Sequence, residues 1–211
     1  MSKSNKYGYS GVDIPTQEFG ANVGKLEPSE INELVANDQW TQYGQLQLIE
    51  TKTGSGDATI DFSDLRTNLY NVHFVTIDAT MSDASSIQIR FFENGVLETS
   101  SVYDTAYQNA TATGSFSPSQ SGSNTRLFGT RTGGAGEIRQ AYNYLYNLGD
   151  STRYSFHTMH GVSRTTGTTA LDMRFGSGLL AQRSTVDGLR FFSTGGGLIT
   201  GKISLYGIRY S

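Results

Sequence analysis

Three histidines, His73, His157 and His160, are the side chains of this 211-residue chain best suited to metal binding or proton transfer. His157 and His160 stand three residues apart in a segment with strand character, and residues three apart on a strand point to opposite faces. The chain has no cysteine, which excludes disulfides, thiolate metal sites and a cysteine nucleophile. We therefore expect no metal site and no cofactor.

The stretch Gly196–Lys202 matches the first seven positions of a phosphate-binding P-loop. Ile203 stands at the eighth position, where a serine or threonine would bind magnesium. The residues that follow alternate as in a strand, so no helix N-terminus is available to receive a phosphate. We interpret this stretch as a glycine turn that leads into the final strand.

Three neighbouring aspartates, Asp57, Asp61 and Asp64, could contain the acid pair of a glycosidase. Asp57 and Asp64 flank a short predicted strand, where aspartate is an ordinary turn residue. The sequence also contains no Gly-x-Ser-x-Gly nucleophile motif. We expect a protein that is not an enzyme.

The composition favours short strands joined by turns, because glycine (25), tyrosine (12) and phenylalanine (11) are abundant while charged residues make up 17%. No run approaches the ~18 apolar residues of a membrane span, and a net charge of −3 gives no overall attraction to nucleic acid. We expect neither membrane nor nucleic acid as a partner.

The charges are divided unevenly along the chain. Residues 1–105 carry 15 acidic and 6 basic side chains, whereas residues 106–211 carry 4 and 10. Either the two halves interleave in one fold and neutralise each other, or an acidic surface of one copy meets a basic surface of a neighbouring copy. Both interpretations remain open at this point.

Residues 1–43 differ from the rest, because they lack regular periodicity yet carry spaced apolar side chains. Such a segment is typical of an arm that packs on another protein. One short helix is predicted over 28–39, with Pro28 at its first position and an apolar stripe at i, i+3 and i+4. The predicted assembly contacts of the arm are Tyr7, Tyr9, Ile14, Phe19, Ile31, Leu34, Val35 and Trp40.

Residues 44–211 show the period-two alternation of β-strands and predict eight to ten strands. Asn94-Gly95 has the residue types of a two-residue hairpin turn. Residues 107–136 are rich in glycine, serine, threonine and asparagine, which predicts a long loop or a loop interrupted by short edge strands. We predict an all-β, antiparallel β-sandwich, with jelly-roll topology, that carries the N-terminal arm.

The dipeptide Arg-Phe occurs three times at predicted strand ends, beginning at Arg90, Arg174 and Arg190. We expect each phenylalanine to be buried and each arginine to point outward. Stacking of these arginines on neighbouring aromatic rings stays open.

Several stretches at the two ends of the chain carry a resemblance: Tyr7–Gly11, Glu30–Leu34, Gln45–Thr51, Ala58–Phe62 and Gly201–Ile208. Together they resemble small virion structural proteins of tailed bacteriophages, especially phages of marine bacteria and cyanobacteria. The resemblance does not extend over residues 100–195. It implies a β-sandwich, often a jelly roll, that is typically trimeric and serves assembly rather than catalysis.

The resemblance implies a virion protein, assembled in the host cytoplasm, that acts as a head-decoration (cement) protein. It would form a homotrimer through its sandwich and hold the major capsid protein with residues 1–43. The alternative is a tail-fibre, knob or adaptor component that binds tail subunits and contacts a host-surface glycan, with Tyr107, Phe116 and Tyr142 as sugar-stacking candidates. A third interpretation, a glycan-degrading enzyme, needs an acid pair that the sequence does not display.

Overall fold

The computed structural model describes residues 28–36, 46–164 and 170–208. The chain separates into two compact units, Met1–Gly44 and Gln45–Ser211, and each is described by itself.

In the first unit the described element is helix α1 (Pro28–Ala36), which lies within the predicted range. Pro28 suits the first helical position, because the N–H that proline lacks would have no partner there. Ile31 and Leu34 are half-buried, whereas Glu33 on the opposite side is exposed, as the i, i+3 stripe predicts.

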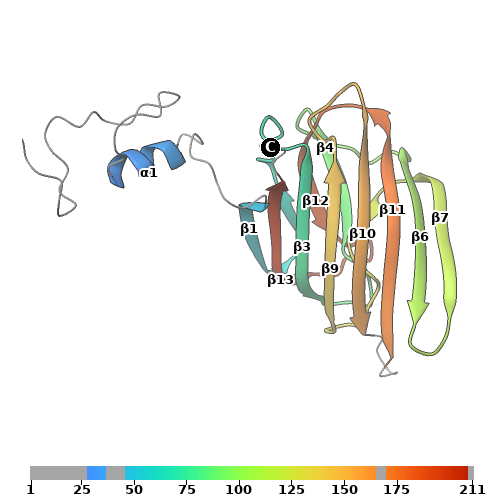
Figure 1. Ribbon diagram of the computed structural model, residues 1–211. Helices are drawn as coiled ribbons and strands as arrows, with labels where there is room; N and C mark the ends of the chain where they lie inside the picture. The colour runs from blue at the N-terminus through green and yellow to red at the C-terminus, as the bar shows by residue number, and fades with distance from the viewer. Residues whose placement is uncertain (1–27, 37–45, 165–169, 209–211) are drawn as a thin grey trace, which may run out of the picture. The chain divides into compact units, whose positions relative to one another are not determined.

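The second unit consists of two antiparallel sheets, a wide one in front of a narrow one in the view of Figure 1. The eight strands of the wide sheet are, in spatial order, β1 (Leu46–Asp57), β13 (Ile199–Ile208), β3 (Val72–Met81), β9 (Ile138–Tyr146), β10 (Tyr154–Arg164), β11 (Leu171–Arg183), β6 (Tyr103–Thr111) and β7 (Phe116–Asn124). The narrow sheet contains β2 (Thr59–Phe62), β12 (Val186–Phe192), β4 (Gln88–Glu93) and β5 (Val96–Leu97), and β8 (Leu127–Phe128) pairs with β4. The predicted all-β antiparallel sandwich is confirmed, and the jelly-roll topology stays a prediction.

The core lies between the facing sides of the two sheets. In β3, Val75 and Ile77 point inward and are buried, while Phe74 and Thr76 point outward, as the pleat of a strand requires. Tyr103 of β6 links the sheets, because its hydroxyl accepts a hydrogen bond of 3.0 Å from the backbone N–H of Phe91 in β4. Each large apolar side chain buried here stabilises the fold by about 1.5–3 kcal/mol.

The segment 107–136 contains more strand than the sequence predicts, because β6 reaches Thr111 and both β7 and β8 fall within it. None of the nine residues of β7 is buried, so this strand has no apolar face to produce alternation. Its pairing with β6 depends on backbone hydrogen bonds, which sequence patterns do not reveal.

Two predicted turns are confirmed. Asn94 and Gly95 have φ values of 51° and 76° and join β4 to β5 in the predicted hairpin. The glycine stretch that resembles a P-loop leads directly into β13, which begins at Ile199. A strand follows the glycines, so this segment presents no helix N-terminus to a phosphate.

The prediction for the Arg-Phe dipeptides is confirmed twice and wrong once. Phe91 and Phe191 are fully buried, and the guanidinium groups of Arg90 and Arg190 stack on rings of the neighbouring strand at 4.6 and 5.2 Å. In β11 the orientation is reversed. Arg174 is buried and Phe175 is 40% exposed, because the outer face of the wide sheet is itself aromatic.

Candidate functional site

The predicted assembly contacts of the arm fall mostly outside the described residues. This holds for Tyr7, Tyr9, Ile14, Phe19 and Trp40. Val35 belongs to α1, but its side chain lies outside the description as well. Ile31 and Leu34 share one side of the helix and are half-buried. The role of all eight residues in assembly stays a prediction.

The three sugar-stacking candidates separate into two groups. Tyr107 is 4% exposed and faces the inside of the sandwich, so the prediction that it could stack on a sugar is wrong. Phe116 and Tyr142 are 68% and 44% exposed and lie on the outer face of the wide sheet.

The predicted opposition of His157 and His160 is confirmed, since His157 is fully buried on the inner face of β10 and His160 lies on the outer face. The three aspartates serve separate contacts. Asp61 forms two hydrogen bonds with Arg190 (2.8 and 2.6 Å), Asp64 pairs with Arg66, and Asp57 ends β1. In the part of the chain that the structure describes, no three His, Asp or Glu side chains are grouped as metal ligands.

A buried hydrogen-bonded network surrounds His157. Its Nε2 lies 2.9 Å from Oδ1 of Asn143, and its Nδ1 lies 3.4 Å from the hydroxyl of Tyr107. The amide of Asn143 in turn donates to the carbonyl of Gly129 (3.1 Å). Burial lowers the pKa of His157 to about 3, so the imidazole stays neutral at physiological pH. We assign this network to the core, because it has no exposed surface on which a ligand could bind.

The most distinctive surface is the outer face of the wide sheet. We call it the aromatic face and define it by Phe74, Phe116, Tyr142, Tyr144, Tyr146, Phe156, Phe175 and Tyr206. The strands that contribute to it are β13, β3, β9, β10, β11 and β7, and they extend from near one edge of the sheet to the other (Figure 1). Sequence reasoning identified only Phe116 and Tyr142 among these residues.

The rings of this face form an unbroken series across the sheet. Phe74 lies 6.0 Å from Tyr206 and 6.2 Å from Tyr142, measured between ring centroids. Tyr142 lies 5.5 Å from His160, which is 6.5 Å from Phe175, and Phe175 is 6.3 Å from Phe116. Edge-to-face and tilted pairs at these distances attract each other, so the series is pre-ordered.

The aromatic face and its margins expose a large apolar area. Eight of the twelve exposed large hydrophobic residues in the described ranges lie there: Leu46, Leu48, Phe116, Ile138, Tyr142, Phe156, Leu171 and Phe175. Their exposed fractions run from 40% to 68%. At about 100 Å² each they present on the order of 800 Å², whereas the largest apolar patch of a typical monomer is about 300–600 Å².

A row with charged side chains lies beside the aromatic rows of this face. Lys202 of β13 and Asp78 of β3 are direct neighbours across the strands, and Gln140 of β9 continues the same row. The rows with most of the aromatic rings lie nearer the middle and carry uncharged residues such as Thr158 and Ser177. An apolar centre with a polar rim is the usual composition of a protein interface.

A groove of about 450 Å³ lies within the aromatic face, over β3, β9 and β10. Its apolar lining comes from Phe74, Tyr142 and Val162. Asp78 and His160 add polar groups, and the hydroxyl of Tyr142 lies 3.2 Å from Nδ1 of His160. Aromatic walls with a few polar groups are typical of ligand sites.

No protein-family model matches this chain, and no curated protein sequence matches it. No helix in the described ranges has the length and hydrophobicity needed to cross a membrane.

Proposed function

We propose that this chain is a non-enzymatic structural protein of a tailed-bacteriophage virion, and specifically a head-decoration protein. In this proposal the sandwich forms a homotrimer, and residues 1–43 attach it to the major capsid protein without any cofactor. The observation that carries the proposal is the aromatic face, because on the order of 800 Å² is the area that each partner buries in a standard protein interface.

The aromatic face favours self-association for a second reason. The buried core lies between the two sheets, and none of the outer rings belongs to it. Exposed aromatic rings at the centre of a patch are the side chains that contribute most to binding energy in protein interfaces. A protein present in many copies on a particle gains further from linked contacts, because avidity multiplies weak individual affinities.

The first test introduces a charge at the centre of the aromatic face. We expect the wild-type protein at micromolar concentration to have three times the 22.9 kDa chain mass by light scattering. Phe175→Glu should weaken association at least 100-fold, because it buries an unpaired carboxylate in the interface. The matched control is Val96→Glu, at a 70% exposed position of β5 in the other sheet, which should remain trimeric.

Two results would contradict this proposal: a monomeric wild type, or the same loss of association in both variants. The number of copies per virion is the second test. If the protein decorates the head, imaging of the particle should show hundreds of copies there. A dozen or fewer copies would assign it to the tail.

A second candidate function, a tail component that binds a host glycan, is favoured by the groove beside Tyr142. Sugar rings stack on aromatic faces, and Asp78 and His160 would supply hydrogen bonds to hydroxyl groups. Glycan-array binding that is lost in Tyr142→Ala but kept in Val96→Glu would support this candidate over decoration.

A further inference from the structure

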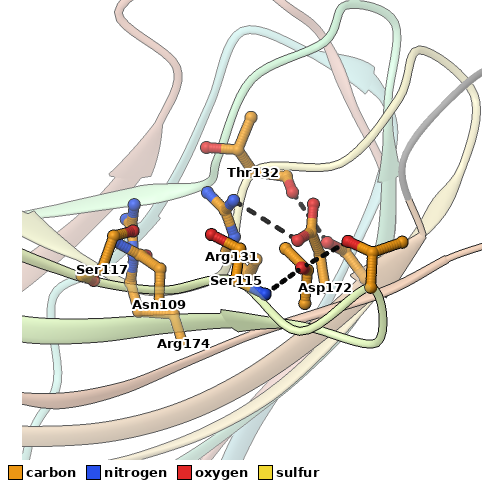
Figure 2. Close-up of polar contacts among 10 residues, drawn as sticks. Asn109, Ser115, Ser117, Arg131, Thr132, Asp172 and Arg174 are labelled. Carbon is orange, nitrogen blue, oxygen red and sulfur yellow. Dashed lines mark hydrogen bonds and ion pairs between the residues drawn. The ribbon is translucent and has the colours of Figure 1, made fainter.

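Two arginines gather where β11 begins, on the side of the wide sheet away from the aromatic face. Arg174 points inward from β11 and is 6% exposed, and Arg131 comes from the segment between β8 and β9. Figure 2 shows both in one polar cluster with Asn109, Ser117 and Asp172. The proposed trimer contact does not use this cluster.

The structure holds Arg174 firmly in place. Its Nε donates to Oδ1 of Asn109 at 2.7 Å, and its guanidinium carbon lies 4.3 Å from the ring centre of Phe128 and 5.7 Å from that of Tyr107. A guanidinium fixed by stacking loses little freedom when it binds a further group.

Hydrogen-bonding capacity remains on both guanidinium groups. Nη2 of Arg131 lies 3.5 Å from Oδ1 of Asp172. By contrast, Nε of Arg131 and Nη1 of Arg174 are buried and have no acceptor among the described residues. A buried donor without an acceptor is unfavourable, more so when it is charged, so the cluster favours an additional acceptor.

The charge of the cluster identifies that acceptor as an anion. Burial and the neighbouring charge of Arg131 lower the pKa of Arg174 to about 10, so the Arg174 guanidinium is still protonated at neutral pH. Two cations beside the carboxylate of Asp172 leave a positive excess. A planar carboxylate fits this excess best, because its two oxygens match the paired N–H groups of a guanidinium.

We propose that Arg131 and Arg174 form a binding site for an aspartate or glutamate carboxylate of another protein subunit. This proposal rests on the assembly function proposed above. The surplus of acidic residues over 1–105 supplies such carboxylates in every neighbouring copy, and Glu33 of α1 is an exposed example. The side chain of Arg131 is 19% exposed, and the exposed residues Ser115 and Ser117 lie beside the cluster on the hairpin between β6 and β7. A partner carboxylate would therefore reach the cluster through Arg131.

The test follows the arginine Nε–H resonances of the full-length protein by NMR during titration with a capped peptide of sequence PSEINELVA, the sequence of α1. We expect saturable shifts for Arg131 and Arg174 in the wild type. Binding should weaken at least tenfold in Arg131→Gln and less in Arg131→Lys. Arg153→Gln, which removes an exposed arginine from a distant turn, should bind like the wild type.

A peptide in which both glutamates are replaced by glutamine should give no shift. The proposal is overturned if that peptide binds equally well, if Arg131→Gln binds like the wild type, or if only a galacturonate oligosaccharide binds. Melting temperatures of the variants confirm that each is folded. Light scattering separates the two proposals, because a trimer without peptide binding contradicts only the carboxylate site.

Discussion

At the scale of single residues, the protein separates buried polar side chains from the surface on which we expect binding. His157 is held neutral inside the sandwich by Asn143 and Tyr107, while His160, three residues further along the same strand, joins the aromatic series outside. The sequence predicted this opposition because strand geometry alone determines it. It could not predict which histidine would be buried, since that depends on which side the narrow sheet covers.

The buried histidines predict how stability depends on pH. Burial lowers the pKa of His157 to about 3 and also lowers that of His73, whereas both titrate near 6.5 in the unfolded chain. Well above pH 6.5 both histidines are neutral in the folded and the unfolded state, so they do not change the free energy of unfolding with pH. Below it the unfolded state binds more protons, so the free energy of unfolding falls by up to about 1.4 kcal/mol per pH unit for each histidine.

Urea denaturation at pH 7.5, 6.0 and 5.0 measures this slope. His157→Gln should reduce the slope between pH 6.0 and 5.0, because of the two buried histidines only His73 then takes up a proton on unfolding. An unchanged slope in that variant would show that His157 is protonated in the folded protein.

At the scale of elements, the wide sheet differs from the pattern that sequence reasoning assumes. Its central strands carry apolar residues on both faces, since Phe74 and Tyr144 alternate with the buried Val75 and Leu145. The sequence therefore located these strands but could not identify which of their faces belongs to the core. For this reason the sequence did not predict the aromatic face. The abundance of tyrosine and phenylalanine is consistent with a second apolar surface but does not locate it.

The connections between strands depend on one buried cation, Arg139 of β9, which is fully buried. Its guanidinium donates to the backbone carbonyls of Asp83, Ser85, Gly133, Gly134 and Glu137 at 2.7–3.1 Å. The residue thus joins two loops to the sheet. Nothing in the sequence distinguishes it from the other arginines, because its acceptors are main-chain atoms.

Replacement of Arg139 tests this role. Arg139→Lys keeps the charge but cannot reach five acceptors with three donors, so we expect it to reduce the free energy of unfolding by about 3 kcal/mol. Chemical denaturation measures the loss. Arg153→Lys, at an exposed turn position, should change stability by less than about 0.5 kcal/mol. Equal effects of the two changes would mean that the loops hold their conformation without the buried guanidinium.

At the scale of the whole molecule, the two compact units predict a separation of tasks. Deletion of residues 1–43 should leave a folded and trimeric sandwich, because the core and the aromatic face lie entirely within Gln45–Ser211. The same deletion should abolish attachment to the particle. Circular dichroism, light scattering and co-sedimentation with heads measure the three properties, and an unfolded truncated protein would contradict the proposed role of the arm.

The strand β7 at one end of the wide sheet has a further consequence. An open sheet edge with free N–H groups can add strands from other molecules without limit, and such growth ends in fibres. Pro118 in β7 has no N–H to donate to an incoming strand. The rest of β7 is rich in serine and contains Gly122, so it offers little side-chain surface on which another strand could pack. Because strand addition at β7 is unfavourable, copies of the protein are expected to associate through the aromatic face instead. A contact between sheet faces adds no strand to an edge, so association through the aromatic face does not extend the sheet at β7.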